Sequence, residues 1–168
     1  MPEPADAPDP NRQAEEAEQF FQRAYEAQIQ GNLETAVDLY RRSIESFATA
    51  KAHTFLGWAY SFQGKTDAAI KECVTAIQID PDFGNPYNDI GAYLIEKGEW
   101  EQAIPWFQKA VFAKDYEARH YPHYNLSRVY EHLNRPFEAI DELKRAISVN
   151  PEYTLARRDL NRLLAKMN

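Results

Sequence analysis

The chain has little of what stabilises small secreted proteins or anchors a protein in a membrane. Its 168 residues include a single cysteine, so an intramolecular disulfide is excluded and nothing demands an oxidising compartment. Cys73 falls in an apolar column, where we expect a buried, inert thiol. No apolar run approaches the roughly 20 residues of a membrane-spanning helix, and no signal-peptide pattern precedes a cleavage site. We therefore expect a cytoplasmic protein without a membrane span.

Positive charge is also in short supply. The chain carries 19 Lys and Arg residues against 26 Asp and Glu residues, which gives a formal net charge of −7. An acidic protein has no general attraction for a phosphate backbone, so we expect no nucleic-acid partner.

Motifs that support catalysis or hold a cofactor are missing from the sequence. We find no G-x-S-x-G nucleophile turn, no P-loop, no dinucleotide-binding glycine pattern and no suitable Cys–His pair. A metal site needs three or four convergent ligands. His120 and His123 are close in sequence, but His123 falls in a core column, as His53 does. We therefore expect no enzyme activity, no cofactor and no metal.

What the chain does contain is a repeated unit. Gly31, Gly64, Gly98 and Asn134 are separated by 33, 34 and 36 residues, and an alanine follows each of them five residues later. A period of about 34 residues is typical of stacked helix-turn-helix units.

The recurring positions have a physical meaning. Apolar residues at i, i+3 and i+7 give each helix one buried stripe. Gly57 and Gly91 let a second helix approach closely, and the glycines of the turns can adopt the left-handed conformation that ends a helix. Asp80-Pro81 and Asn150-Pro151 end the second helix of a pair. The pattern predicts nine helices, of which eight form four antiparallel pairs and the ninth spans roughly residues 153–166.

At these positions the chain resembles the tetratricopeptide repeat family. The second repeat shows the pattern most completely, as His53-x2-Leu56-Gly57-x2-Tyr60, Gly64, Ala69-x3-Cys73-x2-Ala76-x4-Pro81. The resemblance covers Ala17 to Asn168 and rests on several columns that recur together at the right period. It implies an all-α fold, an α-α superhelix of four antiparallel helix pairs with a terminal capping helix.

The same pattern divides the chain into segments. Residues 1–13, which are rich in proline and acidic side chains, are expected to form a disordered tail. Residues 14–151 hold four tetratricopeptide repeats at about 17–49, 50–83, 84–119 and 120–152, and residues 153–168 form the capping helix.

The resemblance also implies where a partner binds, because in this family the first helix of each pair lines the concave side of the superhelix. Aromatic and amide side chains recur on that face, and both suit an extended peptide. The groove residues expected are Phe21, Tyr25, Phe55, Trp58, Phe62, Asn88, Asp89, Tyr121, Tyr124, Asn125 and Arg128. An alternative for the aromatic members, Phe55 and Tyr25 especially, is that they pack between adjacent repeats as core.

Co-chaperone members of the family hold acidic C-terminal peptides with a clamp of lysines, asparagines and an arginine on these helix faces. The matching positions here include Phe21, Phe55, Thr54 and Trp58, which carry no positive charge. The sequence therefore disfavours capture of a chaperone's terminal carboxylates by that clamp.

Two functions remain open. The first is a non-enzymatic module that binds a peptide or protein segment in the concave groove. The alternative is an assembly or scaffold protein that self-associates through its terminal helices, for instance as a homodimer. The packing of Leu160 and Leu163 distinguishes the two functions, because self-association loses its interface if these side chains pack inward. The basic side of this last segment, with Arg158 and Arg162, is expected to be solvated or to contact a partner.

Overall fold

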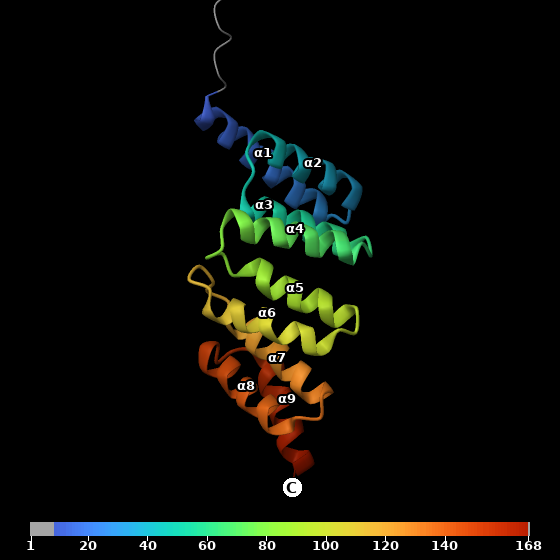
Figure 1. Ribbon diagram of the computed structural model, residues 1–168, viewed down its shortest axis with the longest axis vertical. Helices are drawn as coiled ribbons and strands as arrows, with labels where there is room; N and C mark the ends of the chain where they lie inside the picture. Colours follow the sequence, from blue (N-terminus) through green and yellow to red (C-terminus); the bar gives the residue numbers. More distant parts are fainter. Residues whose placement is uncertain (1–8, 168) are drawn as a thin grey trace, which may run out of the picture. The chain divides into compact units, whose positions relative to one another are not determined.

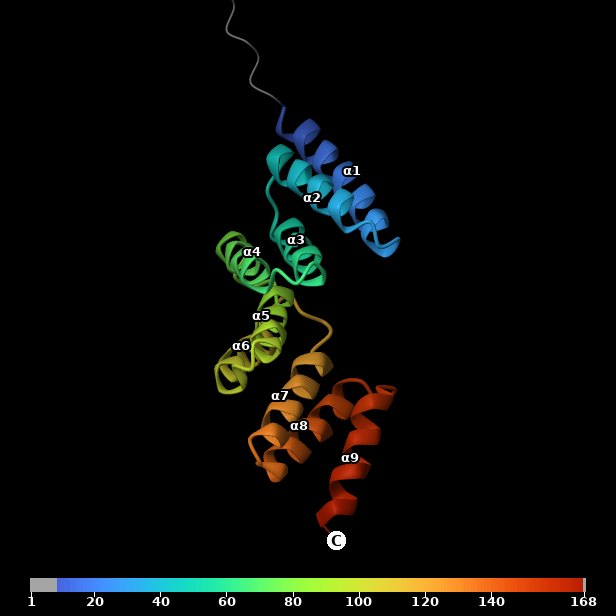
Figure 2. The ribbon, with the colours of Figure 1, turned by 90° about the vertical axis from the view of Figure 1, so that its right-hand side faces the viewer.

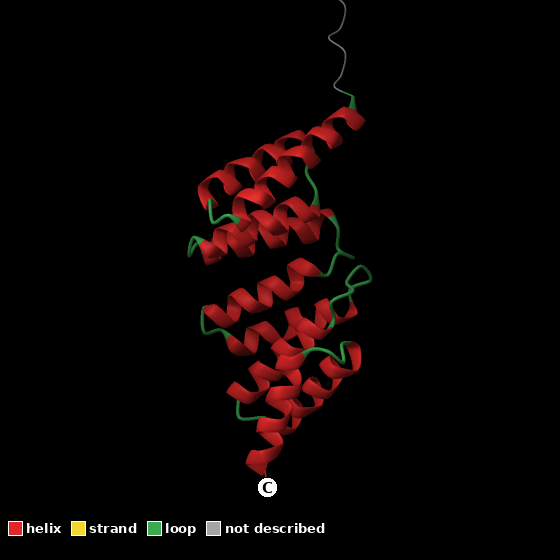
Figure 3. Ribbon diagram, turned by 180° about the vertical axis from the view of Figure 1, so that it is seen from behind, coloured by secondary structure: helices red, strands yellow, loops and turns green. Residues whose placement is uncertain are grey.

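A computed structural model describes residues 9–167 of the chain. Over these residues it consists of nine α-helices joined by short loops and turns, without a β-strand, which confirms the predicted all-α fold and helix number (Figures 1 and 3). The helices are α1 Pro10–Ile29, α2 Leu33–Ser46, α3 Ala50–Phe62, α4 Thr66–Ile79, α5 Asn85–Glu96, α6 Trp100–Phe112, α7 His120–His132, α8 Pro136–Val149 and α9 Thr154–Met167.

The turn inside each helix pair follows from one residue. Gly31, Gly64 and Gly98 have φ angles of 81°, 74° and 81°, and Asn134 has 57°. This left-handed conformation ends the first helix and turns the chain back toward the second. The left-handed turn expected at the glycines is thus confirmed, and Asn134 adopts the same conformation.

The helices group into two compact units, α1–α4 and α5–α9, which meet in the sequence between Ile79 and Asp80. In the first unit α1 packs on α2 and α3 packs on α4, while α2 also contacts α3. Its core combines small residues with a few large rings. Tyr40 is fully buried and donates a hydrogen bond to Gln28, and the Ser43 hydroxyl donates to the Ala17 carbonyl, which joins α1 to α2.

In the second unit α5 packs on α6, α7 packs on α8, and α9 covers α8 (Figure 2). Gly91 of α5 lies directly against the ring of Phe107 on α6. Leu163 of α9 is buried with Leu143 and Ala146 of α8, and Leu160 packs against the same cluster. Leu160 and Leu163 therefore face inward and cap the unit, while Leu155 and Leu164 remain exposed.

The segment between α6 and α7 accounts for the longer third step of the repeat. Backbone hydrogen bonds join the Gly84 N–H to the Asp115 carbonyl and the Asp115 N–H to the Asp82 carbonyl, both at 2.9 Å. Tyr116 is buried against Gly84, where any side chain would collide with its ring. The extra residues thus form a loop that is pinned to the start of the unit.

One boundary expected from the sequence is wrong. The tail was expected to reach residue 13, but α1 begins at Pro10. Asp9 accepts a hydrogen bond from the Asn11 N–H at 3.0 Å, and Pro10 occupies the first helical turn, where its missing N–H costs nothing. Residues 1–8, the rest of the expected tail, lie outside the described residues.

Candidate functional site

The expected groove residues divide between the two units, five in the first and six in the second. In the first unit the first helices of the two pairs, α1 and α3, bring aromatic side chains together. The members of this group are Phe21, Tyr25, Phe55, Trp58 and Phe62. The rings form a connected cluster.

Phe21 belongs to the core of this cluster, not to its surface. Its side chain is 4% exposed and its ring lies 5.1 Å from Phe55 and 5.5 Å from Tyr40. Its expected place in a groove is therefore corrected. The sequence shows which helix face a residue occupies, but not how far the next helix covers that face.

The other four residues form a surface feature that we call the aromatic strip, made of Tyr25, Phe55, Trp58 and Phe62. Successive ring centroids lie 5.8, 5.7 and 5.4 Å apart. Phe55 is half-buried beneath the others, while Tyr25 and Trp58 are each 37% exposed and Phe62 is 59% exposed. Such ring pairs favour edge-to-face or tilted packing, which holds each ring in a defined orientation. The strip is a preorganised apolar surface.

In the second unit the expected residues are mostly polar and bonded to one another. The Asn125 amide donates to the Asn88 oxygen at 3.1 Å, which links α7 to α5. Arg128, one turn further along α7, reaches the Asn125 oxygen at 3.5 Å. Asp89 is partly buried, and burial raises its carboxyl pKa to about 7, against the lowering effect of a hydrogen bond with Asn88. Asp89 is therefore a weaker fixed charge than the sequence implies.

The two groove tyrosines of the second unit, Tyr121 and Tyr124, pack around Tyr153, which precedes α9. The ring of Tyr121 lies 5.7 Å from that of Tyr153 and the ring of Tyr124 lies 5.3 Å from it. Tyr121 remains 46% exposed, whereas Tyr124 is half-buried. The Tyr124 hydroxyl donates a hydrogen bond of 2.8 Å to the Asp159 carboxylate on α9.

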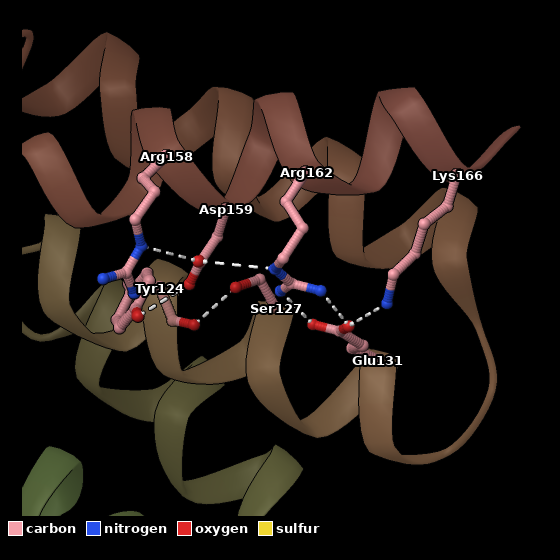
Figure 4. Close-up of polar contacts among 7 residues, drawn as sticks. All are labelled: Tyr124, Ser127, Glu131, Arg158, Asp159, Arg162 and Lys166. Carbon is pink, nitrogen blue, oxygen red and sulfur yellow. Dashed lines mark hydrogen bonds and ion pairs between the residues drawn. The ribbon is translucent and has the colours of Figure 1, made fainter. Parts of the chain in front are cut away.

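That bond is part of a polar network between α7 and α9 (Figure 4). Arg162 of α9 forms two hydrogen bonds with Glu131 of α7, at 2.6 and 2.7 Å, and Lys166 reaches the same carboxylate at 3.7 Å. Arg158 donates to Asp159 at 3.2 Å. A paired, bidentate arginine is the strongest common form of such contacts. The network fixes α9 against α7.

The network also holds its carboxylates ionised. Hydrogen bonding to Arg162 is the main cause that lowers the pKa of Glu131. Burial by itself would raise the pKa of Asp159, but hydrogen bonds from Tyr124 and Arg158, together with the charges of Arg158 and Arg162, outweigh burial and lower it.

Two features of the structure were not foreseen from the sequence. Asp159 is buried although its segment was expected to have a wet charged face. The core histidines also have acidic partners, since His53 contacts Glu72 at 2.7 Å and His123 contacts Glu142 at 2.6 Å. Each pair joins the two helices of one helix pair, α3 to α4 and α7 to α8, at a spacing of 19 residues. The recurrence of this His–Glu spacing in two repeats was the sequence signal from which the pairs could have been predicted.

Within the described residues, no group of three or more His, Cys, Asp or Glu side chains has an arrangement able to hold a metal ion. In the same part of the chain no helix is both long and apolar enough to cross a membrane.

Comparisons with known proteins agree with this geometry. The family model described as tetratricopeptide repeat matches residues 50–83 and 121–153. Small glutamine-rich tetratricopeptide repeat-containing protein 2 of Mycosarcoma maydis is 29% identical over 96 residues, which are 56% of this chain and 27% of that protein. The chain thus spans about a quarter of the length of this relative.

Among solved structures, PilF of Pseudomonas aeruginosa superposes with a TM-score of 0.86 and 22% identity over 92% of this chain and 70% of its own. PilW, described as a widely conserved type IV pilus biogenesis factor, gives a TM-score of 0.79 and 19% identity over 88% of this chain and 68% of its own. At these identities the likeness concerns the fold. The two matched segments, together with the helix pairs and their glycine turns, identify tetratricopeptide repeats in this chain.

Proposed function

We propose that this protein is a non-enzymatic interaction module whose first unit binds a partner polypeptide on the aromatic strip, on the face expected to form the concave groove. Its fold indicates protein–protein interaction, because stacked helical repeats offer extended binding surfaces. The observation that carries the proposal is the exposure of Trp58 and Phe62 beside Tyr25 on a preorganised surface.

The chemistry of the strip defines the partner. Tyr and Trp are enriched among the few residues that carry most of the binding energy of protein interfaces, and they offer a large contact area at low entropic cost. The rings of Tyr25, Trp58 and Phe62 are already held by their neighbours, so little ordering is needed on binding. A segment that presents one or two large apolar side chains, with few charges, is the complementary ligand.

The alternative function, self-association through the terminal helices, is weakened. Leu160 and Leu163 pack against α8 within the second unit, and only Leu155, Leu164 and Met167 of α9 remain exposed as large apolar side chains. The binding role is favoured over the scaffold role for this reason.

The test is selection of peptides from a random displayed library against the full chain, followed by calorimetry of the enriched peptides. Trp58→Ala is expected to weaken binding by more than about 1 kcal/mol if Trp58 is a hot spot, while the melting temperature changes little because the side chain is partly exposed. Selected peptides should be rich in large apolar residues.

Phe137→Ala is the matched control, since Phe137 is exposed on α8, in the other unit and on the second helix of its pair. Binding should be unchanged by it. Enriched peptides that bind Trp58→Ala and Phe62→Ala as tightly as the parent chain, or that are lost with Phe137→Ala, would refute the proposal.

A further inference from the structure

A cavity of about 460 Å³ opens in the second unit between α7, α9 and the first residue of α6. Its wall includes the rings of Trp100 and Tyr124, and two arginines, Arg128 of α7 and Arg158 of α9, line it. Neither Trp100 nor Arg158 belongs to the groove expected from the sequence. The cavity is separate from the aromatic strip, which lies wholly on α1 and α3.

The acidic side chains of this cavity are already paired. Glu131 is engaged by both terminal nitrogens of Arg162, and Asp159 accepts hydrogen bonds from Tyr124 and Arg158. Their charges are therefore largely satisfied by groups of this chain. Arg162 is likewise occupied and contributes little further capacity to bind a ligand.

Arg128 and Arg158 differ from Arg162 in this respect. Arg158 uses only its Nε atom for Asp159 among the described residues, and its side chain is 68% exposed. Arg128 is exposed, and its hydrogen bond to Asn125 is long at 3.5 Å. Each guanidinium carries five N–H donors, so most of the donors of both arginines remain available at the cavity.

The charges of the Arg128 and Arg158 guanidinium groups both influence the Tyr124 hydroxyl. Burial raises the pKa of the Tyr124 hydroxyl, and the charges of Arg128 and Arg158 both oppose this rise. Both charges therefore lie within electrostatic reach of one hydroxyl group. The lining holds three arginines and two carboxylates, and Lys166 also reaches Glu131, so positive charge exceeds negative charge here although the net charge of the chain is −7.

We propose that this cavity binds one carboxylate group of a partner polypeptide, held by Arg128 and Arg158, with the adjoining apolar atoms of the ligand against Trp100 and Tyr124. Guanidinium groups match the planar geometry of a carboxylate. A carboxylate brings one negative charge into this site, whereas a phosphate dianion would bring two beside Glu131 and Asp159. The carboxylate comes from a chain terminus or from an Asp or Glu side chain.

This proposal rests on the chain being an interaction protein but not on the aromatic strip. Trp58→Ala is expected to leave binding at the cavity unchanged, because Trp58 is in the first unit. Failure at one site is thus distinguishable from failure at the other.

The experiment is NMR titration of the full chain, labelled with ¹⁵N, by three matched hexapeptides. One has the sequence acetyl-Gly-Ser-Phe-Gly-Ser-Gly with an amidated end, the second has a free C-terminus, and the third is amidated with Asp in place of the central Gly. We expect at least one carboxylate peptide to shift the Trp100 indole N–H and the side-chain Nε–H signals of the two arginines. The neutral peptide should bind about tenfold more weakly or not at all. Comparison of the second and third peptides distinguishes a terminus from a side chain.

Arg158→Gln should weaken the binding of the carboxylate peptide by about tenfold. Arg157→Gln is the matched control, since Arg157 is the neighbouring exposed residue on α9 and does not line the cavity. If both variants lose the same amount of affinity for the carboxylate peptide, the effect comes from the net charge of the chain, and the proposed site is wrong. Equal binding of the neutral and acidic peptides, or tighter binding of a phosphoserine peptide than of the aspartate peptide, would overturn the assignment of a carboxylate.

Discussion

A single hydrogen in place of a side chain decides how closely α5 and α6 approach. A Cβ atom built on Gly91 would lie 2.6 Å from the Phe107 ring, and Phe107 is fully buried. The ring cannot move away without disturbing the core around it. The close approach expected from the sequence at this glycine is therefore a real constraint on packing.

We expect Gly91→Ala to lower the free energy of unfolding by about 1–3 kcal/mol, the usual cost of overpacking. Urea unfolding measures this cost. Adding Phe107→Leu should recover part of the loss, because it removes the clashing ring atoms, and Glu96→Ala, an exposed change on the same helix, should have little effect. If Gly91→Ala is as stable as the parent chain, the packing interpretation of this glycine is wrong.

Glu142 offers a second test at the level of one side chain. It is buried between His123, at 2.6 Å, and Arg145, at 2.8 Å. Glu142→Ala leaves a buried imidazole without its partner and should cost about 1–3 kcal/mol. Asp141→Ala, at the adjacent exposed position, should cost under about 0.5 kcal/mol. Comparable losses in thermal or urea unfolding would show that the His–Glu pair does not stabilise the fold.

The sequence predicted residues whose role is local better than residues whose role depends on a neighbour. Gly64 and Asn134 were recognisable because a left-handed turn restricts residue type. Phe21 and Tyr25 are both aromatic and lie on the same helix, yet Phe21 is buried and Tyr25 is exposed. The difference arises because Phe55 and Tyr40 both lie against Phe21. Periodicity gives the face of a helix but not the extent to which the next helix covers it.

At the scale of the element, α9 shows both sides of this limit. Its leucine spacing predicted a capping helix, and Leu163 is buried as expected. Its charged side chains were expected to be exposed to solvent. Asp159 is instead buried and accepts a hydrogen bond from Tyr124, which was expected in the groove. A basic helix with a single carboxylate gives no sequence signal for a partner 35 residues earlier.

The carboxylates that hold α9 give its docking a defined pH dependence. The pKa values of Asp159 and Glu131 are lower in the folded chain than in the unfolded chain. Their contribution to stability is therefore complete above an unfolded-state pKa of about 4 and is lost as the pH falls through the lower folded-state values. We expect these two carboxylates to lower the urea midpoint as the pH falls from about 4 to 3. The raised pKa of Asp89 acts in the opposite direction between about pH 7 and pH 4 and is common to the parent and to variants of α9.

Asp159→Asn removes one of these titrating groups. The variant should be less stable than the parent at pH 6, because it loses the charged acceptor of Tyr124 and Arg158, and it should lose less stability than the parent on acidification. Asp141→Asn, on the exposed side of α8, serves as the control. Identical pH dependence in the parent and in Asp159→Asn would contradict a role for this carboxylate in holding α9.

For the whole molecule, the sequence predicted the number and order of helices but not their grouping into two units. The four repeat units share the same turn and packing residues, so nothing in their pattern distinguishes the junction at Ile79 and Asp80 from the other junctions. The loop that pins Asp115 to Asp82 and Gly84 lies within the second unit. Its backbone hydrogen bonds are invisible to an argument from residue type, although the longer repeat step marked the place.

This grouping predicts which helices lose stability when one helix pair is destabilised. In repeat proteins stability is shared mainly between neighbouring repeats, so local opening requires less free energy than complete unfolding. Gly91→Ala should therefore accelerate amide hydrogen exchange most in α5 and α6, by about 5- to 150-fold for a cost of 1–3 kcal/mol. Exchange in α7 and α8 should accelerate less, and exchange in α1 and α2, in the other unit, should be unchanged. Mass spectrometry of peptic fragments resolves these helices. An equal acceleration from α1 to α9 would instead mean that both units open together, and the division at Ile79 and Asp80 would then have no thermodynamic meaning.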